Sequence, residues 1–267
     1  MTDAGAPLRI LVDATTWVGG RSGVGLYTER LLRAFAELGR GDELILASNQ
    51  PLDADDLDAR RLGPHMPVRA LWMQTVLPAL IARERPDVAL FPNYLAPLVR
   101  TCPQVVTVHD LAIWTQAETF TFKKRVLQRA LLPLVLRHAA AILVPSDATR
   151  RDLLRLLPVD PSRVVRTWLA ADPAFHVAVP AETIASVRAE LNLPERYLLA
   201  VGTLEPRKNL VRLIRAFEEV SRSRPDLRLV LAGGKGWRDE GIRRTLQAST
   251  ARDAIVLTGY VSLDALR

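Results

Sequence analysis

The stretch VGTLEPRKNL, residues 201–210, ends an apolar run at Gly202 and places two adjacent cations, Arg207 and Lys208, just before a helix-like segment. The run YLLAVG is typical of a buried strand, and NLVRLIRAFEEVSRSR (209–224) repeats apolar residues at helical spacing. A strand, a glycine turn and a helix in this order indicate one unit of a parallel α/β sheet, and such sheets bind ligands at the carboxyl ends of their strands. Cations there, together with the free N–H groups of a helix start, are typical of a diphosphate site that needs no metal.

Two interpretations remain open for these cations at this point. They can hold a diphosphate, or they can be solvated side chains on a surface loop, since exposed Arg and Lys are common. Asn209, which follows them, is a residue type that often caps a helix with its side chain, so we expect an N-cap there.

Strand and helix patterns alternate along the whole chain, which favours parallel sheets covered by helices. Strands are predicted at 8–14, 42–48, 87–91, 104–110, 140–146, 163–167, 195–202, 227–233 and 254–259. Helices are predicted at 23–38, 71–84, about 120–138, 147–156, 209–224 and 239–250. We therefore predict an α/β fold of two doubly wound domains, residues 1–175 and 176–267. The second domain offers only three strands, so we expect it to be incomplete, with an open apolar strand edge that favours self-association.

The composition indicates a globular protein. Of 267 residues, 49% are hydrophobic and 24% are charged, and no apolar run approaches the length of a membrane span. The N-terminus shows no secretory signal pattern, and the single cysteine, Cys102, fits a reducing compartment, so a cytoplasmic protein is expected. The net charge of +7 indicates an anionic partner, without separating phosphates, lipid headgroups and nucleic acid.

A glycine-rich turn, VGGRSGVGLY (18–27), lies between the first predicted strand and the first predicted helix. It contains four glycines that would let backbone amides approach a phosphate or a sugar: Gly19, Gly20, Gly23 and Gly25. A plain flexible loop is the alternative. The turn is not a complete dinucleotide fingerprint, and ASNQ (47–50) offers no acidic residue after the second strand, which disfavours a nucleotide-binding oxidoreductase.

His109 and Asp110 end the predicted strand 104–110. A histidine at the carboxyl end of a strand suits proton transfer or contact with a sugar hydroxyl, and equally a side chain that bonds a neighbouring backbone group. The four histidines and Cys102 show no metal-ligand spacing, so no metal site is expected from them. The run DAD at 53–55 is a D-x-D pattern that can bind a divalent cation, although carboxylates in such a polar loop are usually just solvated.

The segment TFKKRVLQRALLPLVLRHAA (121–140) combines an apolar stripe with basic residues. The stripe consists of Phe122, Val126, Ala130 and Leu134, and the cations are Lys123, Lys124, Arg125 and Arg129. We expect an ordinary helix with its stripe in the core and its charges in water. The alternative is a helix that lies on an anionic membrane surface, which would place the protein at the inner face of the membrane. No nucleic-acid-binding module accompanies these charges.

Several segments together resemble the family-4 (group 1) retaining glycosyltransferases. The C-terminal half contributes VGTLEPRKNLVRLIRAF, LVLAGGKGW and IVLTGYVS, and the N-terminal half contributes GVGLYTERLLRAF, PDVALFPNYLAPL, VVTVHDLAIW and ILVPSDATRRDLL. The resemblance implies the GT-B architecture, in which two Rossmann-like domains face each other across a cleft. It also implies transfer of a hexose, with GDP-mannose favoured as donor, to a glycan or lipid-linked acceptor, with retained anomeric configuration and without metal or cofactor.

The resemblance assigns roles only at matching positions. Arg207 and Lys208 match the cations that hold the donor diphosphate, and Glu205 lies in the same element. His109 matches the histidine that contacts the transferred sugar. The other positions expected at the nucleotide sugar are Gly23 and Gly25, Gly202 and Thr203, Gly234 and Lys235, and Gly259, Tyr260 and Val261.

The sequence departs from the family in two places. The E-x7-E segment, expected after residue 267, does not occur in it, so the resemblance implies a truncated glycosyltransferase. A binding-competent but inactive fragment is therefore the alternative to an active enzyme. The second departure is VVRTWLAADPAF (164–175), where the family usually has a Pro-Leu-Gly-Val-like turn.

Overall fold

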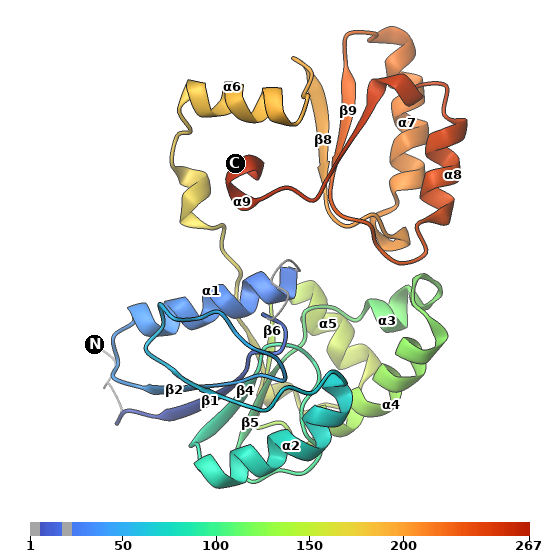
Figure 1. The fold of residues 1–267 in the computed structure, drawn as a ribbon. Helices are drawn as coiled ribbons and strands as arrows, with labels where there is room; N and C mark the ends of the chain where they lie inside the picture. Colours follow the sequence, from blue (N-terminus) through green and yellow to red (C-terminus); the bar gives the residue numbers. More distant parts are fainter. Residues whose placement is uncertain (1–5, 18–22) are drawn as a thin grey trace. The chain divides into compact units, whose positions relative to one another are not determined.

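The structure, a computed structural model, describes residues 6–17 and 23–267. The chain divides into two compact units, Met1–Leu169 and Ala170–Arg267, and each has a sheet of its own (Figure 1). The domain boundary predicted from the sequence, between residues 175 and 176, lies shortly after this division.

The first unit, as far as the structure describes it, forms a seven-stranded parallel sheet in the order β3-β2-β1-β4-β5-β6-β7. Its strands are β1 Arg9–Asp13, β2 Glu43–Ala47, β3 Arg60–Leu62, β4 Val88–Phe91, β5 Gln104–Thr107, β6 Ala141–Val144 and β7 Val164–Arg166. The strand order reverses at β1, which pairs with β2 on one side and with β4 on the other. Open α/β sheets bind ligands beside the carboxyl ends of strands at such a reversal.

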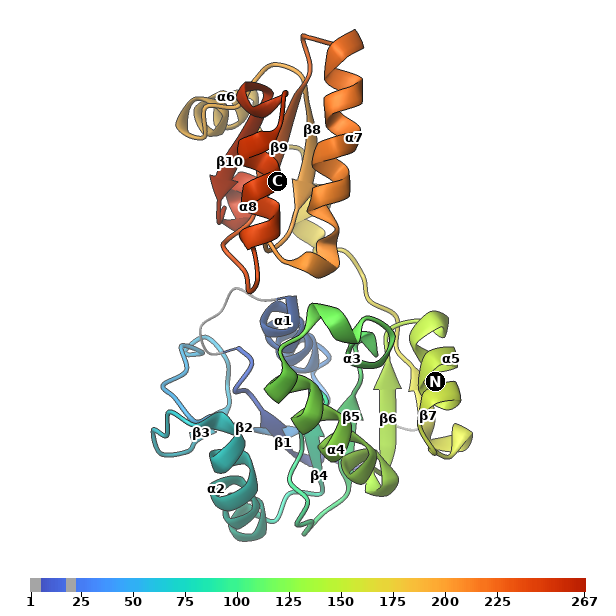
Figure 2. The ribbon, with the colours of Figure 1, turned by 90° about the vertical axis from the view of Figure 1, so that its right-hand side faces the viewer.

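Helices cover both faces of this sheet. They are α1 Gly23–Glu37, α2 Arg69–Glu84, α3 Ala112–Thr115, α4 Phe122–His138 and α5 Asp147–Leu156. Successive residues of β1 point to opposite faces. Val12 packs with Leu32 of α1, whereas Leu11 joins the larger cluster that holds Trp72 of α2 and Leu136 of α4. The helices α1 and α2 accordingly lie on opposite sides of the strands (Figures 1 and 2).

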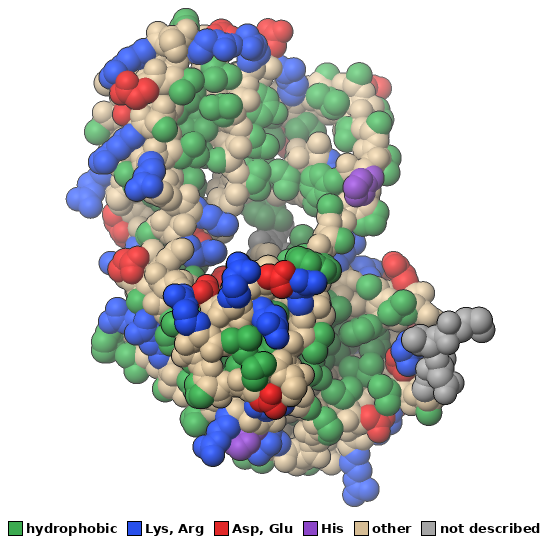
Figure 3. Space-filling model, turned by 180° about the vertical axis from the view of Figure 1, so that it is seen from behind, with side chains coloured by type: hydrophobic (Ala, Val, Ile, Leu, Met, Phe, Trp, Pro, Cys, Tyr) green, Lys and Arg blue, Asp and Glu red, His purple; other side chains and the backbone are tan. Residues whose placement is uncertain are grey.

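The second unit is smaller and has a three-stranded parallel sheet among its described residues, in the order β10-β9-β8. Its elements are α6 Ala181–Glu190, β8 Tyr197–Val201, α7 Leu210–Ser223, β9 Arg228–Ala232, α8 Glu240–Ala248, β10 Ile255–Gly259 and α9 Leu263–Leu266. The helices α7 and α8 cover one face, where Ile214, Phe217 and Ile242 are buried with residues of β9. Basic side chains gather on the outer side of these two helices (Figure 3).

The edge strand β8 is open, as the sequence predicts for one strand of this sheet. Its apolar side chains are exposed, from 36% for Tyr197 to 53% for Val201. By contrast, Leu229, Val230 and Leu231 of the central strand β9 are buried. Exposed apolar side chains on an edge strand form a surface that favours association.

The structure differs from the sequence predictions at three places. The short strand β3 was not predicted because its sequence RRL is basic and it lies exposed at the sheet edge. The strand predicted at 104–110 ends at Thr107, so His109 lies in the loop that follows. Asn209 is the N-cap residue of α7, as predicted, but its side chain makes no cap hydrogen bond; its backbone is left-handed, with φ 55°, and its N–H donates to Pro206 O.

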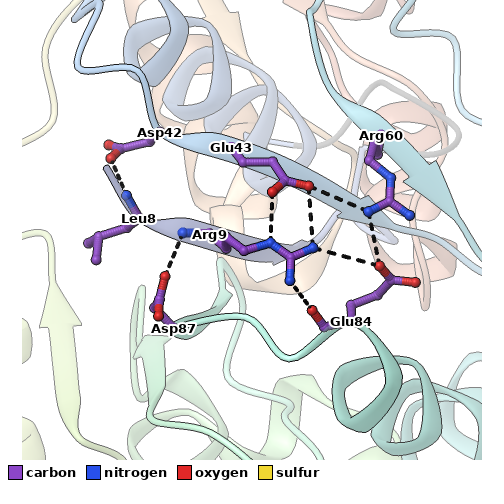
Figure 4. A network of polar contacts seen from close by, with 7 residues as sticks. All are labelled: Leu8, Arg9, Asp42, Glu43, Arg60, Glu84 and Asp87. Carbon is purple, nitrogen blue, oxygen red and sulfur yellow. Dashed lines mark hydrogen bonds and ion pairs between the residues drawn. The ribbon is translucent and has the colours of Figure 1, made fainter. Parts of the chain in front are cut away.

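Ion pairs join the amino ends of three strands to the end of α2 (Figure 4). Arg9, which begins β1, donates to Glu43 of β2 at 2.7 Å and to the backbone oxygen of Glu84. Arg60 of β3 lies 3.4 Å from Glu43 and 3.0 Å from Glu84. Asp87 accepts from the Arg9 N–H at 2.8 Å. This network holds the edge of the sheet that lies opposite the carboxyl ends.

We expect Glu84→Gln to lower the melting temperature at neutral pH. A hydrogen bond from Arg83, followed by the charge of Arg60, lowers the pKa of Glu84. A carboxylate with a lowered folded-state pKa stabilises the fold above its unfolded-state pKa, about 4.3, and this stabilisation disappears as the pH falls through the folded-state pKa. Calorimetric melting temperatures of wild type and variant should therefore differ at pH 7 and converge in acid.

The matched control is Glu37→Gln, which removes an exposed carboxylate at the end of α1. Its melting temperature should follow that of the wild type at every pH. Equal melting temperatures for Glu84→Gln and wild type at neutral pH would contradict the role given to the network.

Candidate functional site

The carboxyl ends of the three strands in the second unit are joined by backbone hydrogen bonds that continue past the strands. Gly202 N donates to Ala232 O at 2.9 Å, and Gly233 N donates to Gly259 O at 2.8 Å. Leu204 N donates to Gly234 O at 3.0 Å. The loops after β8, β9 and β10 therefore form one continuous backbone edge.

Close packing explains two glycines of this edge. A Cβ at Gly233 would lie 2.0 Å from the Gly202 oxygen, and one at Gly236 would lie 2.5 Å from the Leu204 oxygen. No side chain fits at such distances, so the loops after β8 and β9 can only pack this closely with glycine at both positions. Gly234, between them, has open space around it and is available to a ligand.

Lys208 lies over the first glycine of the edge. Gly202 has φ +146°, a conformation that favours glycine, and a Cβ there would meet Lys208 Cε at 3.3 Å and Nζ at 3.7 Å. The lysine side chain is therefore folded along the bare backbone at the end of β8. The residue is exposed at the carboxyl end of the sheet, where parallel sheets bind ligands.

Arg207 is placed differently from its neighbour. Its Nε and Nη2 both donate to Oε1 of Glu205, at 3.1 and 2.8 Å. Glu205 is buried, and it precedes the short 3-10 turn Pro206–Lys208. Of the two adjacent cations, Arg207 is held by a buried carboxylate, and Lys208 extends over Gly202. We call the backbone formed by Gly202, Gly233 and Gly234 at this end of the sheet the glycine edge.

The remaining predicted nucleotide-binding residues of this unit border the same edge. Thr203 and Lys235 are exposed, and Lys235 forms a bridge with Leu204. Gly259 has φ +70°, and Tyr260 after it is 49% exposed. Val261 is half-buried. The structure thus brings Gly202, Thr203, Glu205, Arg207, Lys208, Gly234, Lys235, Gly259, Tyr260 and Val261 to one end of one sheet.

In the first unit, His109 follows β5 and is fixed by its surroundings. Its Nε2 lies 2.8 Å from Pro92 O, and its ring meets that of Tyr27 edge to face, with centroids 4.7 Å apart. A carbonyl oxygen only accepts hydrogen bonds, so Nε2 donates and carries the proton. Burial lowers the pKa of His109, which leaves the ring neutral at pH 7 and Nδ1 as an acceptor. The bond to a neighbouring backbone group is thus present, as one of the two interpretations from the sequence expects, and the contact with a sugar stays a prediction.

The glycine turn is described only in part, because Gly19 and Gly20 lie outside the described residues. Gly23 begins α1 and is exposed, with open space where a Cβ would be. Gly25 is buried in the first turn of the same helix. These positions put bare backbone at a helix start, close in sequence to Tyr27.

Sequence reasoning missed a polar group at the carboxyl end of β1. Asp13 is fully buried and lies 3.1 Å from Arg69, the first residue of α2. The Arg69 Nε also donates to Thr15 Oγ1 at 2.6 Å, and Thr15 donates to Asp13. An aspartate that ends an apolar strand could have signalled this group, but its distant partner Arg69 gave no such signal.

Arginines neutralise part of the acidic loop that contains the D-x-D pattern. Asp55 pairs with Arg61, and the adjacent Asp56 pairs with Arg33. Within residues 6–17 and 23–267, no three His, Cys, Asp or Glu side chains gather as a metal site requires. The geometry gives no support to the D-x-D alternative.

The helix α4 corrects the expectation that its apolar stripe packs in the core. Phe122 is 70% exposed, and Val126 and Leu134 are about half exposed. The buried residues of the helix are instead Gln128, Leu132, Val135 and Leu136. Lys124 lies over the ring of Phe120, and Arg125 over that of Phe122. The stripe is therefore exposed, as are Lys123, Lys124 and Arg129 of the same helix, and we call these exposed residues together the α4 face.

No helix in the described part of the chain is both long and apolar enough to cross a lipid bilayer.

Comparisons with known proteins cover both units. The family model described as Glycosyltransferase Family 4 matches residues 21–175, and the model described as Glycosyl transferases group 1 matches residues 183–267. The O-antigen chain mannosyltransferase B of Escherichia coli is 30% identical over 171 residues, which are 64% of this chain and 45% of that protein. The chain thus spans less than half the length of this curated relative.

Solved structures agree with the fold. The Anabaena protein HepE in complex with UDP-glucose has a TM-score of 0.71 at 14% identity, over 97% of this chain and 71% of its own. WaaG, a glycosyltransferase involved in lipopolysaccharide biosynthesis, has a TM-score of 0.68 at 12% identity, over 96% and 72%. These likenesses show the GT-B fold that the sequence predicts.

We expect nuclear magnetic resonance to show a neutral His109 ring protonated on Nε2, with a titration midpoint below that of an ordinary histidine, about 6.5. Because the proton binds more tightly to the unfolded chain, His109 should make stability fall as the pH drops below that value. Tyr27→Ala should raise the midpoint by admitting water to the ring. A midpoint at or above the ordinary value in the wild type would contradict the burial argument; His109→Gln identifies the resonance.

Proposed function

Because the chain belongs to glycosyltransferase family 4, we propose that it binds a nucleoside-diphosphate sugar and transfers its hexose to a glycan or lipid-linked acceptor. The observation that carries this proposal is the glycine edge of the second unit. There the Lys208 side chain lies 3.3 Å from the Cβ position of Gly202, at the carboxyl end of β8. A cation beside glycine backbone at the carboxyl end of a parallel strand suits a diphosphate. Because the chain belongs to a glycosyltransferase family, we no longer consider the oxidoreductase alternative.

The favoured donor is GDP-mannose, with retention of the anomeric configuration. A mannosyltransferase among the relatives supports mannose, whereas the HepE complex contains UDP-glucose and keeps a UDP sugar as the competing donor. The residues proposed to contact the nucleotide are those of the glycine edge, together with Gly23 and Gly25 of the first unit. We propose no cofactor and no metal, since the amine of Lys208 can supply the positive charge.

The chemistry follows from where charge develops. As the bond between sugar and diphosphate breaks, the diphosphate oxygens become more negative and the sugar becomes oxocarbenium-like. A cation held in place before the reaction stabilises this charge without reorganising, and loss of one such contact costs on the order of 10²–10³ in rate. His109, with Nδ1 as acceptor, is proposed to receive a hydrogen bond from a hydroxyl of the transferred sugar.

Calorimetric titration with GDP, UDP and their sugars tests the donor site. We expect binding to the wild-type chain in excess chelator, and affinity at least about tenfold weaker in Lys208→Ala, because a charge-assisted contact is lost. The control variant Arg60→Ala lacks a cation at the amino end of the first unit's sheet, far along the chain from Lys208, and should bind the nucleotides as the wild type does.

Unchanged affinity in Lys208→Ala would refute the diphosphate assignment, and a requirement for Mn²⁺ would restore the D-x-D alternative. Binding without sugar transfer would support the inactive-fragment alternative. Where transfer is measurable, His109→Ala should lower kcat more than it weakens donor affinity, because its contact is made to the reacting sugar.

We further propose that the α4 face rests on an anionic membrane surface at the inner side of the cell membrane. An apolar stripe flanked by lysines and arginines matches acyl chains and acidic headgroups together. A lipid-linked acceptor would then be within reach of a protein held at that surface.

Vesicle sedimentation tests this second proposal. The chain should bind phosphatidylglycerol vesicles and not phosphatidylcholine vesicles. Lys123→Gln with Lys124→Gln should weaken binding about fivefold for each charge, since a basic residue near an anionic surface contributes ~1 kcal/mol. Phe122→Ser should weaken binding as well, whereas Leu38→Ser, an exposed apolar residue after α1, should not. Equal binding to both lipids would refute the proposal.

A further inference from the structure

The two adjacent cations of the glycine edge are set in different surroundings, and this difference indicates a division of labour. Arg207 is half-buried and directed at Glu205, whereas Lys208 is exposed and lies along Gly202. Neighbouring residues with the same charge thus make different contacts, one within the turn and one at its surface.

Glu205 is an unusual residue for an anion-binding edge. Its side chain is 3% exposed, and an ionised carboxylate at such a position requires a charged or hydrogen-bonded partner. Two guanidinium nitrogens of Arg207 supply it, both donating to Oε1. The planar guanidinium donates in fixed directions, so this pair restricts the backbone between the two residues as well as their side chains.

The backbone of the turn closes on the same residues. Lys208 N donates to Glu205 O at 3.1 Å, and Asn209 N donates to Pro206 O at 3.0 Å. Asn209 has a left-handed backbone, and its oxygen accepts from Arg212 N and Leu213 N at the start of α7. A side-chain pair across residues 205 and 207 therefore stabilises the turn that aims residue 208.

We propose that Glu205 and Arg207 form a positioning pair, and that Lys208 is the cation which the turn presents to the diphosphate. This inference rests on the proposed function for the ligand, and on the contacts above for the pair. Arg207, which the family resemblance pairs with Lys208 as a diphosphate ligand, acts through the turn and through Glu205.

The proposal and simple electrostatics predict opposite changes in nucleotide affinity when the charge of Glu205 is removed. If Arg207 contacts the diphosphate directly, Glu205 competes with the ligand for it and repels the anion, so removing the carboxylate charge strengthens binding. If the pair positions Lys208, removing the charge loosens the turn and weakens binding. Glu205→Gln, which keeps the size of the side chain, separates these outcomes.

The experiment measures the affinity of the full chain for GDP and UDP by calorimetry. We expect Glu205→Gln to bind on the order of tenfold more weakly than wild type, the scale of a lost hydrogen bond to a charged group. Arg207→Gln should lose a similar factor, and the double variant should lose little more than either alone. Glu219→Gln, which breaks an exposed pair with Arg222 on the same unit, controls for net charge and should bind as wild type does.

Hydrogen exchange tests the pair without any ligand. The amides of Lys208 and Asn209 should exchange faster in Glu205→Gln and in Arg207→Gln, and at the wild-type rate in Lys208→Ala. If these amides keep their protection in Glu205→Gln, or if that variant binds nucleotide more tightly, the positioning pair is refuted. If no nucleotide binds the wild type, the proposed function fails, and the exchange rates still decide whether Glu205 and Arg207 order the turn.

Discussion

Because the strands pair in parallel, all strand starts lie at one end of each sheet and all strand ends lie at the other. The rest of the structure follows from the difference between these two ends. In the first unit, strand starts and the end of α2 meet at the amino edge, where Arg9, Glu43, Arg60 and Glu84 neutralise one another (Figure 4). These charges are paired with one another within the protein. At the carboxyl ends, loops leave every strand in the same direction, and open α/β sheets bind their ligands beside these loops.

Glycine lets the loops at the carboxyl end of the second unit's sheet pack against each other. The 2.0 Å separation between a Cβ position at Gly233 and the oxygen of Gly202 shows that the two loops are packed to contact. Side chains at these positions would separate the loops and break the backbone hydrogen bonds that continue past the strands. The Lys208 side chain lies against Gly202, so the residue whose oxygen packs against Gly233 also leaves room for the cation.

The sequence predicts what depends on local pattern, and it fails where distant neighbours decide. Apolar runs such as those of β1 and β9 predict buried strands, because a parallel sheet covered on both faces requires them. The strand β3 has no such run, since an edge position tolerates charge. The stripe on α4 has the period of a core-facing helix, yet Leu132, Val135 and Leu136 on another side of the helix make the packing contacts. Periodicity identifies an apolar face and does not say whether the face is covered.

The same limit applies to the candidate site. The adjacent residues Arg207 and Lys208 are equivalent in any pattern of charge. The structure distinguishes them, because Arg207 pairs with the buried Glu205. A cation that stabilises a leaving group acts best when its position is set before the reaction, because a flexible side chain must be ordered at that moment. A lysine has many rotamers and cannot fix itself. The turn therefore holds its charged residue through a rigid guanidinium and a buried carboxylate, and the position of the amine is determined by two side chains that need not touch the ligand.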